Sequence, residues 1–130
     1  SNREYPNHYE VRSLLGTDIR VMTLSDMFAH KLCALGERIT PRDIYDVWFF
    51  LQNRTEINAE IVQLRTGLSV SEYAQQCATQ VRSYSSRMLM QGLGEVLLDN
   101  QSKNFARQQL IPATASALEL FALCPLIAEL

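Results

Sequence analysis

Patterns that bind metals or form disulfides are scarce in this sequence. The three cysteines, Cys33, Cys77 and Cys124, are odd in number, far apart and free of any C-x-x-C spacing, which argues against a disulfide framework and against a zinc site. The two histidines, His8 and His30, are too few and too distant for a metal cluster. We therefore interpret the cysteines as small core residues and expect a reducing, cytoplasmic location.

A strong charge bias and a long uninterrupted apolar run are also missing. The net charge is −2, with 20% charged and 47% apolar residues. This composition excludes a disordered chain and a basic nucleic-acid-binding arm, so a polyanionic partner would need a local basic patch. The most apolar stretch, residues 113–130, is interrupted by Glu119, Pro125 and Glu129, which favours a packed helix over a membrane span. We expect no membrane contact.

The chain is long enough for one domain. At 130 residues it can bury roughly two-thirds of the surface that its unfolded form exposes. Residues 9–15 and 19–24 are rich in β-branched and aromatic residues, and the Gly-Thr-Asp segment between them predicts a β-hairpin. The rest shows helical periodicity. The prediction is a mainly α fold in one compact unit, with a small N-terminal hairpin in residues 1–24 and a bundle of about five to seven helices in residues 25–130.

Capping residues and prolines divide the bundle into helices. The clearest start is Thr40 as N-cap, Pro41 at the first helical position and Asp43 three residues after the cap. Thr55 is a candidate cap for the next helix, with Gly67 as its end, and Pro112 is expected to separate the last two helices. The predicted ranges are 25–37, 40–53, 55–67, 69–84, 87–99, 103–110 and 113–123.

Two acids lie within an apolar segment, "ERITPRDIYDVWFFL", residues 37–51. In a helix, Asp43 and Asp46 share a stripe with Val47 and Phe50, because positions three, four and seven apart face the same way. A buried charge without a partner is costly. The aromatic residues of this segment, Tyr45, Trp48, Phe49 and Phe50, nearly encircle it and predict a central core helix rather than a base-stacking platform.

Basic residues border the preceding helix on the side that should face these acids. Lys31 lies beside an apolar stripe, and Arg38 follows one heptad later. A short connection makes two helices neighbours, so Lys31 can reach Asp43 or Asp46, and we expect these acids and bases to satisfy one another. Two interpretations stay open: Asp43 as a helix cap with a structural ion pair nearby, or a functional site.

Residues 24–51, "LSDMFAHKLCALGERITPRDIYDVWFFL", resemble the abortive-infection AbiEii/AbiGii nucleotidyltransferase family. That family carries a helix with an A-x-K-L-x-A-L core, an arginine, and R-D-x-Y-D-[LV] followed by aromatics; His30 replaces the acid that often precedes the lysine, and we expect it on the outer face. The match covers 28 of the 130 residues. The matching positions are Ala29, Lys31, Leu32, Ala34, Leu35, Arg38, Arg42, Asp43, Tyr45, Asp46 and Val47.

The resemblance implies a bacterial, cytoplasmic enzyme related in fold to DNA polymerase β. Such an enzyme uses Mg²⁺ and moves a nucleoside monophosphate from an NTP to an acceptor, typically as the toxin of a toxin–antitoxin pair, with RNA and especially tRNA as an acceptor class. It implies that Lys31, Asp43 and Asp46 are catalytic and that Arg42 and Arg38 bind substrate. A cation for the triphosphate and a carboxylate that orients or deprotonates a nucleophile fit this chemistry.

One half of the expected site is not in the sequence. Polymerase-β-like enzymes hold their metals with a Gly-Ser turn and a downstream acid-x-acid strand, and no such acid pair occurs here. The resemblance therefore implies the C-terminal portion of a longer enzyme, inactive and without bound cofactor by itself. The opening Ser-Asn is typical of a cleaved expression tag. The alternative is a noncatalytic helical module that binds a protein such as an antitoxin through Leu118, Phe121 and Leu126.

Overall fold

The N-terminal part of the described chain is a two-stranded antiparallel hairpin. A computed structural model describes residues 9–129; the opening residues 1–8, on which the suggestion of a tag remnant rests, lie outside it. Strand β1 (Tyr9–Leu14) pairs with β2 (Thr17–Met22), from Tyr9↔Met22 to Leu14↔Thr17. Leu15 and Gly16 both have positive φ, 52° and 79°, as a two-residue type I′ turn requires. The predicted hairpin is confirmed, with its turn one residue earlier than expected.

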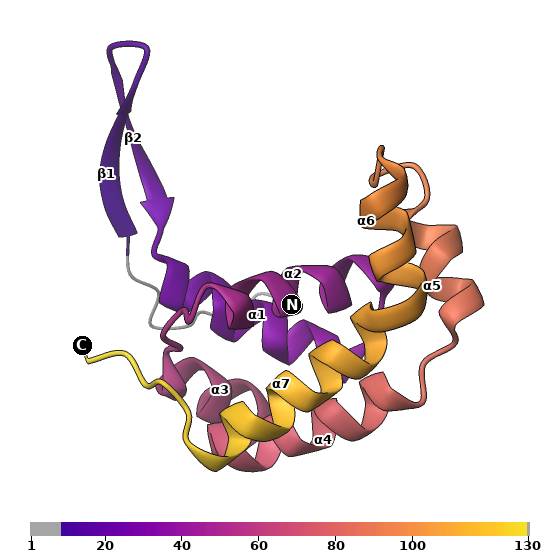
Figure 1. The fold of residues 1–130 in the computed structure, drawn as a ribbon. Helices are drawn as coiled ribbons and strands as arrows, with labels where there is room; N and C mark the ends of the chain where they lie inside the picture. Colours follow the sequence, from indigo (N-terminus) through magenta and orange to yellow (C-terminus); the bar gives the residue numbers. More distant parts are fainter. Residues whose placement is uncertain (1–8, 130) are drawn as a thin grey trace.

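The remainder is helical, as predicted. In Figure 1 the hairpin stands away from the helices, and α1 and α2 lie beside each other above α3, α4 and α7. The boundaries are α1 (Leu24–Glu37), α2 (Pro41–Gln52), α3 (Ala59–Thr66), α4 (Val70–Arg82), α5 (Ser86–Leu93), α6 (Asn100–Phe105), the π-helix η1 (Ala106–Leu110) and α7 (Ile111–Leu123).

The start of α3 differs from the prediction because a distant segment holds the residues before it. Thr55 does not cap this helix; the Asn58 side chain accepts hydrogen bonds from Glu60 N and Ile61 N. Ile57 instead pairs with the C-terminal tail: its N–H donates to Leu126 O at 2.8 Å, and Ala128 N donates to Ile57 O at 2.9 Å. Residues 55–58 therefore cannot join the helix.

Pro112 does not separate the last helices. The segments α6, η1 and α7 follow one another without a gap. In a regular α-helix the proline ring clashes with the carbonyl four residues earlier. The wider π turn of residues 106–110 immediately before Pro112 relaxes this conflict. In contrast, α5 ends at Leu93 rather than at residue 99.

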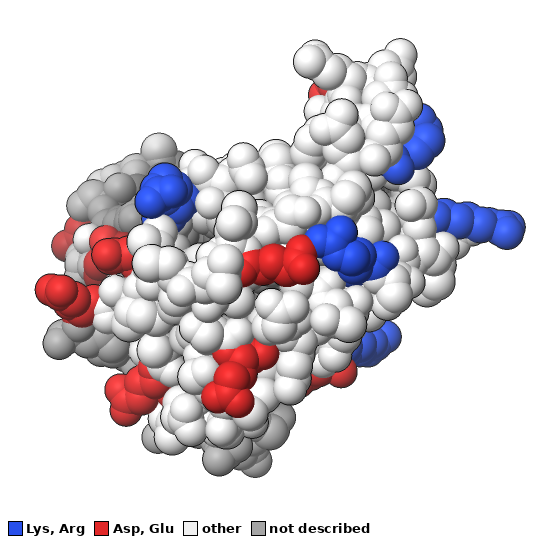
Figure 2. All heavy atoms as spheres, turned by 60° about the horizontal axis from the view of Figure 1, so that its bottom comes forward, with Lys and Arg blue, Asp and Glu red and all other residues white. Residues whose placement is uncertain are grey.

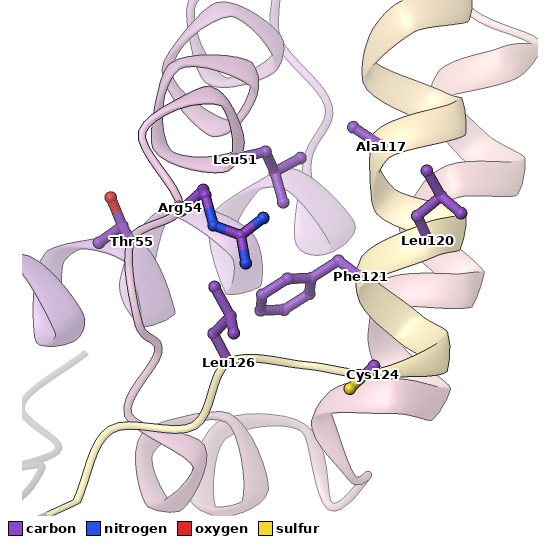
Figure 3. Close-up of a pocket in the computed structure, with 8 residues that line it drawn as sticks. All are labelled: Leu51, Arg54, Thr55, Ala117, Leu120, Phe121, Cys124 and Leu126. Carbon is purple, nitrogen blue, oxygen red and sulfur yellow. The ribbon is translucent and has the colours of Figure 1, made fainter.

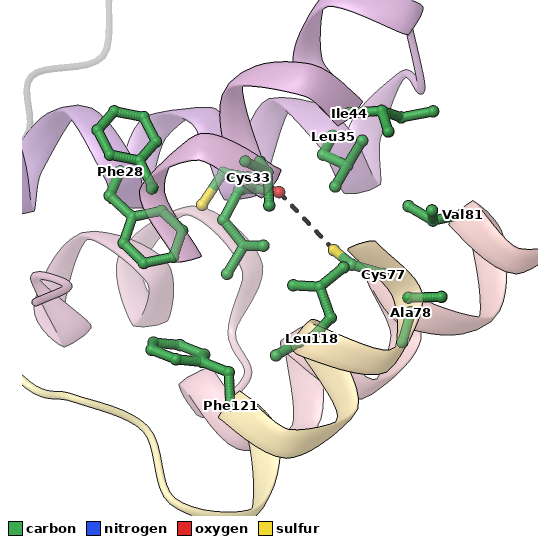
Figure 4. Close-up of a cluster of buried hydrophobic side chains, with 14 of the residues drawn as sticks. Phe28, Cys33, Leu35, Ile44, Cys77, Ala78, Val81, Leu118 and Phe121 are labelled. Carbon is green, nitrogen blue, oxygen red and sulfur yellow. Dashed lines mark hydrogen bonds between the residues drawn. The ribbon is translucent and has the colours of Figure 1, made fainter. Parts of the chain in front are cut away.

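The core lies where α1, α2, α4 and α7 meet (Figure 4). Phe28 stacks on Phe50 with ring centroids 5.1 Å apart and contacts Phe121 at 5.5 Å. Leu118 and Phe121 are both buried, so these two residues do not belong to an exposed interaction surface, whereas Leu126, the third residue of that surface, is only partly buried. These contacts fix α1 against α2, the two helices that carry the candidate site.

Two of the three cysteines are core residues as predicted. Cys33 and Cys77 are buried, and burial raises the pKa of the Cys33 thiol to about 11 and that of Cys77 to about 12, so both stay protonated and unreactive at neutral pH. The prediction is wrong for Cys124, which is exposed. Helix α7 ends at Leu123, and Cys124 begins the extended tail.

Gly36 is needed where α1 meets α4. A Cβ at this position would collide with the Tyr73 hydroxyl, which donates to Cys33 O at 2.8 Å. We expect Gly36→Ala to lower the free energy of unfolding by about 2 kcal/mol, through overpacking and loss of this hydrogen bond. Urea denaturation followed by circular dichroism measures it. A gain of stability, the usual result of Gly→Ala in an open helix, would contradict the packing.

Candidate functional site

Three charged side chains converge between α1 and α2. Lys31 projects from α1, and its Nζ lies 3.3 Å from Asp43 Oδ1 and 3.0 Å from Asp46 Oδ2 on α2. The predicted contact of Lys31 with both acids is confirmed. These three residues form the Lys31 cluster.

Local sequence positions the two acids. Thr40 Oγ1 accepts a hydrogen bond from Asp43 N at 3.1 Å, and Pro41 occupies the first turn, so the cap predicted from the sequence sets the start of α2. Asp43 therefore lies near the positive end of the helix dipole, where an acidic side chain stabilises the helix. Asp46 follows three residues later on the same face. The capping role and the ion pair coexist, so neither excludes a functional role.

The cluster is partly open to solvent. The side chain of Lys31 is 40% exposed, while those of Asp43 and Asp46 are 15% and 24% exposed. The hydrogen bond to Asp46 raises the pKa of Lys31, and the attraction of both carboxylates adds to it against the opposing effect of burial. Lys31 is therefore a cation at neutral pH, held in a fixed place and accessible to an anionic ligand.

The two arginines expected at the site have different positions. Arg42 Nε lies 3.6 Å from Asp46 Oδ1, and its side chain is 64% exposed. Arg38 does not join: it is exposed and makes no ion pair within residues 9–129. Helix α1 ends at Glu37 and Arg38 is extended, with φ −153°, so the heptad spacing from Lys31 no longer applies. The expectation for Arg38 was wrong in this respect.

The prediction that His30 lies on the outer face is wrong, because its side chain contacts α3. Its Nδ1 lies 3.0 Å from Arg65 Nη1, and Arg65 also binds Glu37 at 2.8 Å. Burial, followed by the Arg65 charge, lowers the pKa of His30, although Asp26 and Glu37 act in the opposite direction. The ring is therefore neutral at pH 7 and able to accept the Arg65 hydrogen bond.

This lowered pKa predicts a pH effect on stability. The unfolded histidine takes up a proton at about pH 6.5, before the folded one does, so acidification favours unfolding below that pH. We expect His30→Gln to reduce the loss of unfolding free energy on going from about pH 7.5 to about pH 5. Denaturant titrations of both proteins at both pH values measure the difference. Equal losses would show that His30 is not perturbed.

A hollow of about 540 Å³ lies along the same helix pair, toward the hairpin. It is lined by residues from β1, from the start of α1 and from the end of α2 into the segment that follows: Glu10, Leu24, Ser25, Phe49, Phe50, Asn53, Thr55 and Glu56. Phe49 is 54% exposed there, so the prediction that the aromatics of α2 all belong to the core is wrong for Phe49. The only feature of the sequence that indicated an exposed Phe49 was its position three residues after Asp46, on the same side of the helix.

A second hollow, of about 360 Å³, separates the end of α2 from α7 and the tail. In Figure 3 the Arg54 side chain lies among Leu51, Phe121 and Leu126. Its backbone is left-handed, with φ 52°. This apolar hollow could not be predicted from the sequence, because its walls come from segments far apart in the chain.

A metal site is not complete in the described residues. Among residues 9–129, no group of three or more His, Cys, Asp or Glu side chains is placed to hold a metal ion. Asp43 and Asp46 are the only acids of the Lys31 cluster, and both contact Lys31. Two carboxylates held by a cation do not fit the ligand set of a two-metal site.

No helix in this part of the chain is long and apolar enough to cross a membrane.

Comparison with known proteins identifies the family of the chain. The profile of the family described as "Nucleotidyl transferase AbiEii toxin, Type IV TA system" matches residues 1–121. The chain belongs to the AbiEii nucleotidyltransferase toxin family. Searches of curated proteins and of solved structures gave no match. AbiEii membership connects the chain with nucleotidyl transfer in toxin–antitoxin systems, and the matched range includes the hairpin, the Lys31 cluster and most of α7.

Proposed function

We propose that this AbiEii-family chain forms one wall of a nucleotidyltransferase site that moves a nucleoside monophosphate from an NTP to an RNA acceptor. The observation that carries the proposal is the convergence of Lys31 with Asp43 and Asp46 in a partly open cluster. The side chain of Lys31 is 40% exposed, so an anionic ligand can reach its ammonium group.

Each residue has a distinct role in this proposal. Lys31 binds the triphosphate of the NTP, because a fixed cation stabilises the negative charge that develops during phosphoryl transfer. Asp43, the less exposed acid, orients or deprotonates the acceptor hydroxyl. Asp46 positions Lys31 through the 3.0 Å contact and also holds Arg42, whose exposed guanidinium binds phosphate oxygens. Arg38, exposed at the end of α1, contributes at most to substrate binding from the rim.

The hollow beside Phe49 suits the nucleoside part of the NTP. Leu24 lies seven residues before Lys31 on α1, and Asn53, the C-cap of α2, lies seven residues after Asp46. At 1.5 Å per residue, this hollow is about 10 Å along the helices from the cluster. An exposed aromatic ring supplies a stacking surface for a base. We therefore expect the triphosphate to lie at Lys31 with the base toward the hairpin.

The metal ligands would come from residues outside this sequence. Nucleotidyltransferases of this kind generally use a divalent metal with the NTP, and the metal supplies charge neutralisation at the phosphates. In the proposal, residues 1–24 are the remainder of the nucleotidyltransferase sheet, residues 25–130 are the helical wall, and the bacterial cytoplasm supplies NTP and RNA. The chain alone would then be inactive.

Transfer of labelled nucleotide tests the proposal. A longer protein that includes this chain is incubated with each α-³²P-labelled NTP, Mg²⁺ and total tRNA, beside the 130-residue chain alone. We expect labelled RNA from the longer protein and none from the chain. Labelled RNA from the chain alone would refute the incomplete site, and no labelling by either protein would refute the transfer function.

A noncatalytic module that binds a protein such as an antitoxin is the second candidate. Its predicted surface is buried at Leu118 and Phe121, but Leu120 and Leu123 on α7 are 69% and 82% exposed. Leu120 lines the hollow of Figure 3. Binding of an antitoxin that Leu120→Asp abolishes, without any nucleotide transfer by the longer protein, would favour this candidate.

A further inference from the structure

A hollow at the opposite end of the bundle from the tail combines two arginines with uncharged polar groups. It has a volume of about 410 Å³ and is lined by Ser86, Arg87, Met90, Gln91 and Arg107. Among the described residues that line it, none is acidic. The first four belong to α5, and Arg107 comes from η1. The two guanidinium groups thus reach one hollow from different helices.

The arginines differ in how they are held. Arg107 Nη1 donates to Asn104 Oδ1 at 3.0 Å, a neutral partner that orients the guanidinium and leaves its charge uncompensated. Arg87 is exposed and makes no ion pair within residues 9–129. By contrast, Arg82 is paired with Glu119 and Arg65 with Glu37. The charge of the hollow is therefore available to an external anion.

The surface around the hollow carries more basic than acidic side chains, although Glu95 and Asp99 are exposed between α5 and α6. On the face shown in Figure 2, basic side chains lie mainly toward the side of α5 and α6, and acidic side chains gather toward the other side. Lys103 lies four residues before Arg107 in the same continuous helical segment. The chain as a whole has a net charge of −2, so the hollow, which Arg87 and Arg107 line without an acid, is a local basic patch on a slightly acidic protein.

Helix α5 connects this patch to the Lys31 cluster. A Cβ on Gly92 would lie 2.5 Å from Pro41 Cγ, so α5 packs directly on the first turn of α2. Gln91 of the hollow precedes Gly92, and Arg42 of the site follows Pro41. An extended ligand that crosses the hollow along α5 thus leads toward the start of α2, where Asp43 lies.

We infer that the Arg87–Arg107 hollow binds the phosphodiester backbone of single-stranded RNA and guides it toward the Lys31 cluster. Guanidinium groups bind phosphate oxygens in a bidentate manner, and the Gln91 amide and Ser86 hydroxyl are further donors. No base edge needs to be read, so binding is independent of sequence and strongly dependent on salt. The identity of the ligand rests on the proposed function; the position of the hollow does not.

Fluorescence anisotropy of the 130-residue chain with a labelled oligouridylate of about 12 nucleotides tests this inference. We expect the Arg87→Gln/Arg107→Gln variant to weaken binding by about tenfold or more at low salt. We also expect it to reduce the slope of log affinity against log salt by about 1 to 1.5. The matched control is Arg20→Gln/Arg54→Gln, which removes two exposed arginines of the hairpin and of the Figure 3 hollow and should bind as the wild type does.

Three results would overturn the inference: no binding by the wild-type chain, unchanged binding by Arg87→Gln/Arg107→Gln, or an equal loss in the control. Thermal unfolding of each variant checks that the fold is intact. Failure here is separable from failure of the proposed function, because binding is measured without transfer. If Lys31→Met abolishes transfer while the Arg87→Gln/Arg107→Gln variant binds RNA normally, the proposed transfer site is supported and RNA binding by the hollow is refuted.

Discussion

Replacing Lys31 by methionine in a longer protein that includes this chain is expected to reduce nucleotide transfer by about 10² to 10³, the usual effect of removing a group that stabilises charge in a transition state. Asp43→Asn is expected to cost about 10² to 10⁴ because it removes a general base. Asp46→Asn keeps one carboxylate beside Lys31 and should cost less than either. Labelled transfer to tRNA, at saturating and at low NTP, measures all three.

The stability of the same variants separates catalysis from folding. A partly exposed ion pair contributes about 0 to 1 kcal/mol, so Lys31→Met should hardly change the melting temperature. The pKa of Lys31 is raised, so its contribution to stability is complete below the pKa of the unfolded chain and is lost only as the pH rises through the folded pKa. Between neutral and mildly alkaline pH, Lys31 therefore does not change the free energy of unfolding. Arg54→Met is the control for loss of a cation. Full transfer activity in Lys31→Met and Asp43→Asn would refute the assignment.

Asn58→Ala is expected to produce the largest loss of stability among the polar substitutions considered. Asn58 is fully buried; its Nδ2 donates to the buried Asp26 Oδ1 at 2.8 Å, and its Oδ1 caps α3. Loss of the cap costs about 1 kcal/mol, and loss of a hydrogen bond to a charged group costs about 1.5 to 3 kcal/mol. We expect the free energy of unfolding to fall by about 3 kcal/mol and the melting temperature by about 10 °C.

The control for this prediction is another asparagine at a helix end. Asn53 is exposed, and its Nδ2 donates to Phe49 O at 2.8 Å, so Asn53→Ala should change stability by less than about 0.5 kcal/mol. Asn58→Asp keeps the acceptor for the α3 cap but places a second carboxylate against Asp26; it should be strongly destabilised at neutral pH and partly recover on acidification. Equal melting temperatures for Asn58→Ala and Asn53→Ala would contradict the role of the buried pair.

Local signals in the sequence predicted the elements that depend on near neighbours. Thr40, Pro41 and Asp43 set the start of α2 within four residues of chain, and the structure has the predicted cap. The contact of Lys31 with Asp43 and Asp46 followed from helix spacing and a short connection. Ser69 and Glu72 likewise mark the start of α4.

Features that depend on distant residues could not be predicted in this way. Thr55 is as good a cap as Asn58 by composition, and only the pairing of Ile57 with the tail decides between them. The buried Asp26 gave no signal, because its partner lies 32 residues away. The position of Arg38 was predicted by continuing the heptad spacing from Lys31. Helix α1 ends one residue earlier, at Glu37, so that spacing does not apply to Arg38.

The pairing of Ile57 with the tail also has a consequence for synthesis on the ribosome. Ile57 and Ile127 form a parallel bridge, and about 70 residues of chain separate them. At about 5 to 20 residues per second, the ribosome needs roughly 4 to 14 seconds to make that length. During this interval the N–H and C=O groups of Ile57, just before α3, have no partner from the tail. The contact of Ile57 with the tail therefore forms last, after α7 has emerged. A nascent chain stalled before residue 126 would expose the unpaired backbone groups of Ile57 to chaperones.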